Sequence, residues 1–233
     1  CSSNVVGQRE RHDILYTIVP WLIFTFDIIH RETSMEKTTD VTKSLWTLEA
    51  DMVFLNHGSY GATPKEILSE QQRWRDRLES QPCRFINHEA PTAIRHSASH
   101  LADFLSADQD DIVFVENTTS GINAVLNSIS FEAGDEVLVS DHIYNAVRNS
   151  ILFQIESVGA KLVVASVGLP LSNEKEIVDK FCIGINKKTR LIVVDHVASV
   201  SGVVFPVSSI AKKAQEKNIP VLVDGAHAPG MLD

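Results

Sequence analysis

The sequence has few cysteines, no dense run of basic residues and no uninterrupted apolar stretch of membrane-spanning length. Its three cysteines, Cys1, Cys83 and Cys182, are widely spaced and form no CxxC pair, which argues against a disulfide framework or a zinc site. The net charge of −9 argues against a nucleic-acid backbone as a partner. These absences favour a reducing, cytoplasmic compartment and a protein that does not bind nucleic acid.

The longest apolar run lies near the start of the chain, in residues 14–29 (ILYTIVPWLIFTFDII). It contains Pro20 and Asp27 and is shorter than the roughly 20 residues of a spanning helix. Arg9 and Arg11 precede it as in a signal peptide, but no small-x-small cleavage site follows. We interpret residues 1–34 as an uncertain N-terminal extension, favour a mis-extended or incomplete gene product over an anchor, and expect no membrane partner.

The remainder has an ordinary globular composition, with 44% apolar and 22% charged residues. Short apolar runs of strand length alternate with stretches of helical length, which predicts an α/β fold whose mostly parallel (mixed) sheet is sandwiched by helices. We expect residues 35–90 to form an N-terminal segment and residues 91–233 to form the main domain. The predicted strands are Ile112–Val115, Glu136–Val139, Lys161–Ala165, Leu191–Val194 and Val221–Val223. The predicted helices are Lys65–Ser80, Pro91–Leu105, Thr119–Ser130, Ile143–Val158, Glu174–Ile185 and Val207–Lys217.

Polar and titratable residues follow four of these strands. Because ligands of such sheets bind at the carboxyl ends of the strands, these residues are the candidate site. Thr118 and Thr119 lie between a strand and a helix, where free backbone N–H groups and hydroxyls can bind an anion, although the same residues also suit a plain helix cap. The glycine spacing of a Walker loop or dinucleotide fingerprint is absent from this turn.

Asp224 ends an apolar strand, where it can cap the next turn or pair with the ring nitrogen of a heteroaromatic cofactor. Tyr144 and His142 could each lie flat over such a ring, and Tyr144 could equally be a half-buried core aromatic. Ser199 and His227 could hydrogen-bond a phenolate oxygen. Together these side chains favour a flat, anionic, nitrogen-containing ligand.

Five segments in order resemble class V aminotransferases of the fold-type I pyridoxal-phosphate superfamily, with the isopenicillin N epimerase-like and cysteine desulfurase-like branch as the nearest match. The segments are VFLNHGSYGATPKEIL, VENTTSGINAVLNSI, SDHIYNAVRNS, VDHVASVSGVVFPV and VLVDGAHAPG. The resemblance covers about Asp51 to the end of the chain. It implies the large domain of a fold-type I enzyme, pyridoxal 5′-phosphate as cofactor, an amino-acid substrate and a homodimer.

The resemblance also implies individual roles. Thr118 and Thr119 match the phosphate-binding turn, and Tyr144, with His142 as its neighbouring candidate, matches the residue that stacks on the ring. Asp224 matches the partner of the ring nitrogen, while Ser199 and His227 match groups near the phenolic oxygen. More weakly, a substrate side is implied for four residues of the N-terminal segment: Asn56, His57, Tyr60 and Arg84.

One departure concerns the lysine that forms the Schiff base in this family. It is expected roughly twenty residues past the aspartate, at a spacing set by another strand and turn, whereas no lysine follows Asp224 here. We therefore expect a truncated product or partial gene, with no catalytic residue present and the domain incomplete at its C-terminus. Aminotransfer, epimerisation, elimination and desulfuration all remain open as reactions of a complete relative.

Two other interpretations stay open. A metal-dependent hydrolase could be built from the pairs Asp141-His142 and Asp195-His196 with Asp224 and His227, although no HxxxH or HxH signature occurs and we expect no metal. A non-catalytic pseudoenzyme that keeps only the fold is the other, and the missing lysine favours it.

Overall fold

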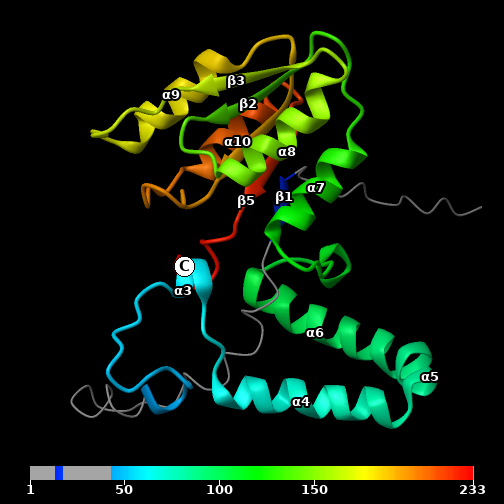
Figure 1. Ribbon diagram of the computed structural model, residues 1–233. Coiled ribbons are helices and arrows are strands. Elements are labelled where there is room, and N and C mark those ends of the chain that lie inside the picture. Colours follow the sequence, from blue (N-terminus) through cyan, green and yellow to red (C-terminus); the bar gives the residue numbers. More distant parts are fainter. Residues whose placement is uncertain (1–13, 18–42, 233) are drawn as a thin grey trace, which may run out of the picture. The chain divides into compact units, whose positions relative to one another are not determined.

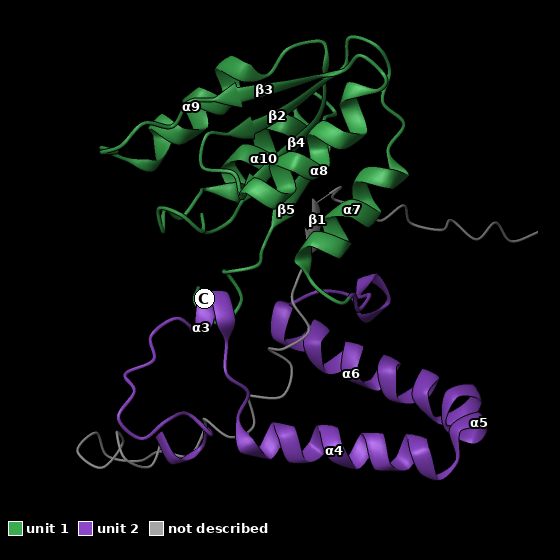
Figure 2. Cartoon of the chain, in the orientation of Figure 1, with its two compact units in different colours: residues 1–18, 116–233 green, residues 19–115 purple. Residues whose placement is uncertain are grey.

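The computed structural model describes residues 14–17 and 43–232, and the contacts divide the chain into two compact units (Figure 2). Unit 1 comprises residues 1–18 and 116–233, and unit 2 comprises residues 19–115. These units differ from the domain ranges expected from the sequence, because residues 91–115 group with unit 2. Apart from 14–17, the apolar run 14–29 and the rest of the extension 1–34 lie outside the described residues.

Unit 1 is built on a parallel sheet with the strand order β1-β5-β4-β2-β3. The strands are β1 (Ile14–Thr17), β2 (Glu136–Ser140), β3 (Lys161–Ala165), β4 (Thr189–Asp195) and β5 (Val221–Asp224). The last four agree with the predicted strands to within two residues. Residues of β2, β4 and β5 are buried almost throughout, as continuous apolar runs covered on both faces should be.

Helices cover both faces of this sheet (Figure 1). One face packs against α7 (Thr118–Ser128) and α8 (Asn145–Glu156), whose Ile122, Leu126 and Ile151 meet Val193 and Leu222. The other packs against α9 (Glu174–Gly184) and α10 (Val207–Gln215), whose Phe181 and Ile210 meet Val194 and Val223. The predicted α/β sandwich is therefore confirmed, and it places the N-terminal ends of α7 and α8 on one side of the sheet's carboxyl edge.

Side-chain caps fix where two of these helices begin. The Asn117 side chain accepts a hydrogen bond from the N–H of Ser120 at 2.9 Å, and that of Asn173 accepts one from Glu176 at 3.3 Å. Both residues are the helix N-caps in extended conformation. Such caps satisfy N–H groups that the helix itself leaves without acceptors.

The predicted strand Ile112–Val115 is wrong, because the chain there is irregular and is joined to no ladder. A strand exists only through hydrogen bonds to a neighbour, and among the described residues no strand lies beside this segment. The Ile112 carbonyl instead accepts a hydrogen bond from Arg95 at 3.0 Å. The apolar pattern of this segment is that of a strand, but the pattern does not show whether a neighbouring strand is available for pairing.

Unit 2 is helical over most of its described length. Its elements are α3 (His57–Tyr60), α4 (Lys65–Ser80), α5 (Pro82–Arg84), the π-helical η3 (Phe85–Glu89), α6 (Ala90–Leu105) and the 3₁₀ turn η4 (Gln109–Asp111). The predicted helices Lys65–Ser80 and Pro91–Leu105 are confirmed. Among the described residues, no helix is both long and apolar enough to cross a bilayer.

Candidate functional site

Strand alternation places two aspartates on the same face of the sheet. Leu191 and Val193 on β4, and Leu222 on β5, point into the core beneath α7 and α8. Because side chains alternate along a strand, the next residues on that face are Asp195 and Asp224. They are register partners on neighbouring parallel strands, and both are buried, with 4% and 6% exposure.

Asp224 is held by the turn that follows β5. Its Oδ1 accepts a hydrogen bond from the N–H of Ala226 at 3.0 Å. Burial raises the pKa of this carboxyl, while the Ala226 N–H and nearby His227 lower it in part. A carboxylate so placed can accept a hydrogen bond from a cationic donor that enters the edge of the sheet.

Asp195 is the functional candidate that sequence reasoning missed, having appeared only within the metal alternative. Its Oδ1 accepts a hydrogen bond from the Tyr144 N–H at 3.3 Å, while its Oδ2 is buried without a partner. Burial, and then the charge of Asp224, raise the pKa of Asp195 to about 7. The signal that could have revealed it is a second aspartate ending a parallel strand at the same register.

The N-terminal end of α7 presents donor groups that could bind an anion. Thr118, the first residue of the helix, is buried with 8% exposure, and its Oγ1 has no hydrogen-bond partner. The first N–H groups of a helix have no intrahelical acceptor, and the Asn117 cap takes only that of Ser120. The N–H groups of Thr118 and Thr119 therefore point out of the helix end, where an anion is favoured.

Tyr144 and His142, the two candidate stacking residues, lie in different surroundings. Tyr144 is the N-cap of α8, is 45% exposed, and uses its backbone to bind Asp195. The His142 ring is fixed by hydrogen bonds of 2.7 Å to Ser201 Oγ and to the Val167 carbonyl, and its edge contacts Phe205. Phe205 belongs to the core under α9 and α10, so the geometry favours Tyr144, whose backbone N–H binds Asp195, over His142 as the residue beside the aspartates.

Ser199 and His227 lie in the segments that follow β4 and β5. Ser199 is exposed in a turn closed by the pairing of Val197 with Val204. His227 is half-buried and acts on Asp224 electrostatically. Both candidates therefore follow strands at the carboxyl edge, and His227 is the one that interacts electrostatically with Asp224.

The weaker substrate-side candidates all belong to unit 2. His57 Nδ1 accepts a hydrogen bond from the N–H of Ala62 at 3.3 Å, Tyr60 is 80% exposed, and Asn56 is the N-cap of α3. Arg84 forms an ion pair with Glu89 at 3.0 Å. Their roles stay predictions from the resemblance.

The titratable pairs considered for a metal do not converge. His142 packs toward the α9–α10 side, whereas Asp195 and Asp224 face α7 and α8. In the part of the chain that the structure describes, no group of three or more His, Cys, Asp or Glu side chains is placed to hold a metal ion. The hydrolase alternative gains no support from this geometry.

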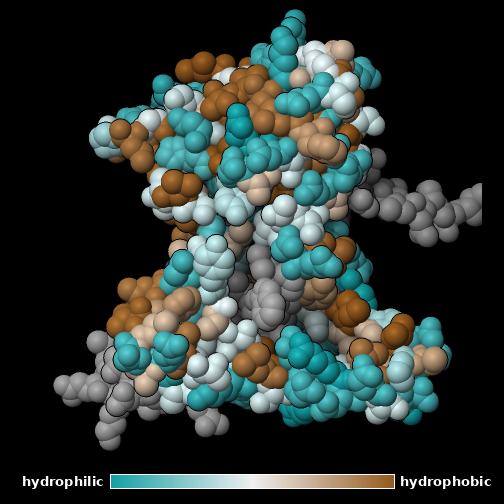
Figure 3. Space-filling model, viewed as in Figure 1, coloured by the Kyte–Doolittle hydropathy of each residue, from teal (hydrophilic) through white to brown (hydrophobic). Residues whose placement is uncertain are grey.

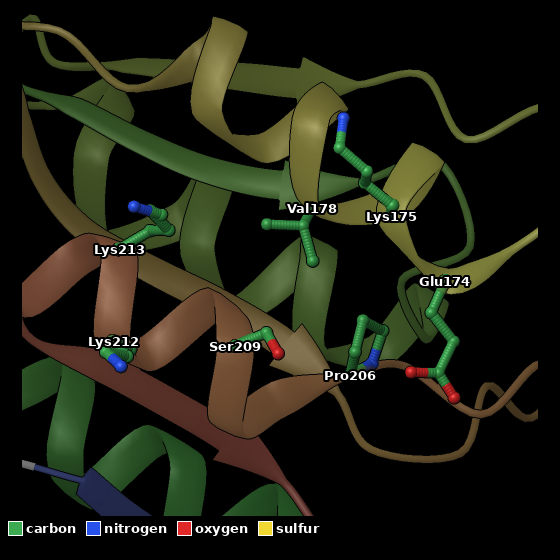
Figure 4. Close-up of a pocket in the computed structure, with 7 residues that line it drawn as sticks. All are labelled: Glu174, Lys175, Val178, Pro206, Ser209, Lys212 and Lys213. Atoms are coloured by element: carbon green, nitrogen blue, oxygen red, sulfur yellow. The ribbon is translucent and has the colours of Figure 1, made fainter.

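A surface groove lies between α9 and α10, away from these aspartates. Glu174, Lys175 and Val178 line one wall, and Pro206 with α10 residues lines the other (Figure 4). Lys175 pairs with Asp179 at 2.6 Å and Lys213 pairs with Glu216 at 2.8 Å. Because these charges are solvated and already paired, the groove lacks the unpartnered buried groups found at the carboxyl edge.

The parallel α/β sheet and its polar carboxyl edge place the chain in the fold class of fold-type I pyridoxal-phosphate enzymes. A solved complex of the cystine C-S lyase C-DES with cysteine persulfide superposes with a TM-score of 0.71 at 23% identity, over 78% of this chain and 49% of that one. The cysteine desulfurase CsdA of Escherichia coli gives a TM-score of 0.66 at 23% identity, over 82% and 50%. At these identities the likeness establishes the fold.

The sequence profile of the family Aminotransferase class-V matches residues 53–231, and the chain belongs to this family. It is 30% identical over 200 residues to a probable chloroplastic L-cysteine desulfhydrase of Arabidopsis thaliana, covering 79% of this chain and 42% of that protein. It is 30% identical over 186 residues to isopenicillin N epimerase of Streptomyces clavuligerus, covering 80% and 47%. The chain thus spans a little under half the length of these curated relatives.

Proposed function

We propose that the carboxyl edge of the unit 1 sheet binds pyridoxal 5′-phosphate, as part of a class V enzyme that acts on an amino acid. The observation that carries the proposal is the position of Asp224. This buried carboxyl lies on the sheet face covered by α7 and α8, and α7 begins with the unpartnered hydroxyl of Thr118. One small ligand with an anionic tail and a basic ring nitrogen matches both groups.

The residues fit the cofactor at its two charged ends. The N–H groups and hydroxyls of Thr118 and Thr119 would hold the phosphate, since a helix N-terminus combines free donors with a favourable dipole. Asp224 would accept the hydrogen bond of the protonated ring nitrogen. Tyr144 would cover one face of the ring, while His227 and Ser199 would stand near its phenolic oxygen.

Bound pyridoxal phosphate serves as an electron sink for reactions at the α-carbon of an amino acid. The part of this chain is to bind and orient: Asp224 keeps a proton at the ring nitrogen, and the buried edge excludes water from that ion pair. Relatives named as desulfhydrase and epimerase favour loss of a sulfur group or inversion at the α-carbon.

Lysine is absent from the segments after β2, β4 and β5, namely residues 141–145, 196–206 and 225–232. These segments therefore offer no amine for a covalent link to the cofactor, and we propose that two copies of the chain associate as a homodimer, as the family resemblance implies. On this view the 233-residue chain binds the cofactor reversibly. Borohydride treatment followed by mass spectrometry should then find no lysine carrying it.

Equilibrium dialysis with pyridoxal 5′-phosphate tests the binding proposal. Asp224→Asn should weaken binding by about 30- to 100-fold, because a charge-assisted hydrogen bond is lost. Thr118→Val, which keeps shape and removes the hydroxyl, should weaken it by about five- to tenfold. Ser209→Ala, in the groove beside α10, is the matched control and should leave the affinity unchanged.

Equal binding by the wild type, Asp224→Asn and the Ser209→Ala control would overturn the assignment of Asp224. A cofactor that binds only through surface lysines would be revealed by labelling of residues such as Lys175 or Lys213, and that result would contradict the proposed site.

A further inference from the structure

Asp195 is a buried acid that the proposed function does not use. It ends β4 directly beside Asp224 on β5, and the backbone N–H of His196 donates to the Asp224 carbonyl at 2.8 Å. This hydrogen bond joins the two strands at the position of the two carboxyls. Neighbouring strands lie about 4.8 Å apart, so two carboxylates held there repel each other.

The hydrogen-bond partners of the two acids are unequal. Asp224 Oδ1 accepts a 3.0 Å bond from Ala226, and His227 lies close enough to favour its negative charge. Asp195 Oδ1 accepts a longer bond of 3.3 Å from the Tyr144 N–H, and its Oδ2 is enclosed without any partner. The charge is therefore better tolerated on Asp224, and a proton is better placed on Asp195.

We propose that Asp195 is a positioning residue that keeps a proton on its Oδ2, so that the pair carries one negative charge, on Asp224, and offers one O–H donor to the ligand. The pair then matches a heterocycle with a single protonated nitrogen and a hydrogen-bond acceptor. The ligand assignment rests on the proposed function, whereas the protonation of Asp195 is a property of the ligand-free chain.

The titratable surroundings of the pair are few. From β5 and the turn after it come Asp224 and His227, and from the start of α8 comes Tyr144, which binds Asp195 through its backbone. The residue that follows β4, His196, has its pKa lowered by burial, which favours its neutral form. No lysine or arginine acts on either acid among the described residues.

Difference infrared spectroscopy of the ligand-free full chain tests the proton directly. The wild type should show the C=O stretch of a protonated carboxyl at pH 6, well above the range in which exposed aspartates ionise. Asp195→Asn should remove that band. Asp224→Asn should keep it but move its disappearance to lower pH, because the neighbouring charge is gone. A wild type without the band, or a band that survives Asp195→Asn, overturns the proposal.

Binding of pyridoxal 5′-phosphate gives the second readout. Asparagine reproduces the protonated acid, since its oxygen accepts from Tyr144 and its amide donates. Asp195→Asn should therefore bind the cofactor with an affinity within about threefold of the wild type. Asp195→Leu, of similar size, should bind it about tenfold more weakly. A tenfold loss in Asp195→Asn would mean that the ligand needs a second anion and would overturn the donor role. If the wild type fails to bind, the proposed function fails, while the infrared result still decides where the proton lies.

Discussion

The carboxyl edge beneath α7 and α8 and the groove between α9 and α10 both gather charged side chains, but only one has the properties of a site. At the edge, Asp195, Asp224 and Thr118 are buried, and two of them have polar atoms without partners. In the groove, Lys175 and Lys213 are solvated and paired with acids four and three residues further along the chain. The difference teaches that desolvated, unpartnered polar atoms mark a binding site better than charge or hollow shape.

The largest expected effect concerns the pH dependence of stability. Because the pKa of Asp195 is raised to about 7 from an ordinary value of 3.8, the folded state holds a proton that the unfolded state has released between those pH values. The resulting stability is present at low pH and is lost as pH rises through about 7, by about 4 kcal/mol at most. Urea titrations at several pH values measure it.

Asp195→Asn is the control for that measurement, since asparagine cannot ionise. It should flatten the slope between pH 4 and pH 7 and make the variant more stable than the wild type at pH 8. If the free energy of unfolding depends on pH in the same way for both proteins, Asp195 does not titrate between pH 4 and pH 7. The carboxyl edge would then not differ from the groove in holding a buried, protonated acid.

A second prediction is that His142 stabilises the fold on the α9 and α10 side of the sheet and does not bind the cofactor. His142→Ala removes two hydrogen bonds of 2.7 Å and a ring contact with Phe205. The free energy of unfolding should therefore fall by about 2–3 kcal/mol. Thermal unfolding checks it, with binding of pyridoxal phosphate measured in the folded variant. An unchanged stability together with lost binding would return His142 to the role of ring-stacking residue.

Tyr144→Ala should have the opposite profile. Its side chain is 45% exposed, so stability should change by less than about 1 kcal/mol, whereas removal of a stacking surface should weaken cofactor binding by about tenfold. Tyr144→Phe keeps the ring and serves as the matched variant. If Tyr144→Phe binds as poorly as Tyr144→Ala, the hydroxyl rather than the ring face is the contact.

The smallest effect should come from the groove. Lys213→Ala removes an exposed ion pair with Glu216, the residue that caps the end of α10. The loss should lower the free energy of unfolding by no more than about 0.5 kcal/mol and leave cofactor binding unchanged. Chemical denaturation and dialysis measure both. A tenfold loss of affinity would mean that the groove, and not the carboxyl edge, takes the phosphate.

Sequence patterns predicted the sheet and its covering helices well, because apolar runs such as Leu191–Val194 report burial on two faces and caps such as Asn117 report helix starts. They failed at Ile112–Val115, whose strand-like pattern says nothing about a pairing partner. Residue patterns alone left both His142 and Tyr144 as ring-stacking candidates, although the resemblance preferred Tyr144. The tertiary contacts with Phe205 and Asp195 distinguish their surroundings. Asp195 escaped notice because its meaning depends on register with Asp224.

The hydrogen bond from the His196 N–H to the Asp224 carbonyl has a further consequence. It joins the ends of β4 and β5 at the position where Asp195 and Asp224 lie side by side. The two strands cannot move apart to reduce the repulsion between the carboxyls without breaking this hydrogen bond. Protonation of one carboxyl is therefore the remaining way to reduce it. If the two acids share one negative charge as proposed, a charged ligand would change the protonation of the pair rather than the spacing of the strands.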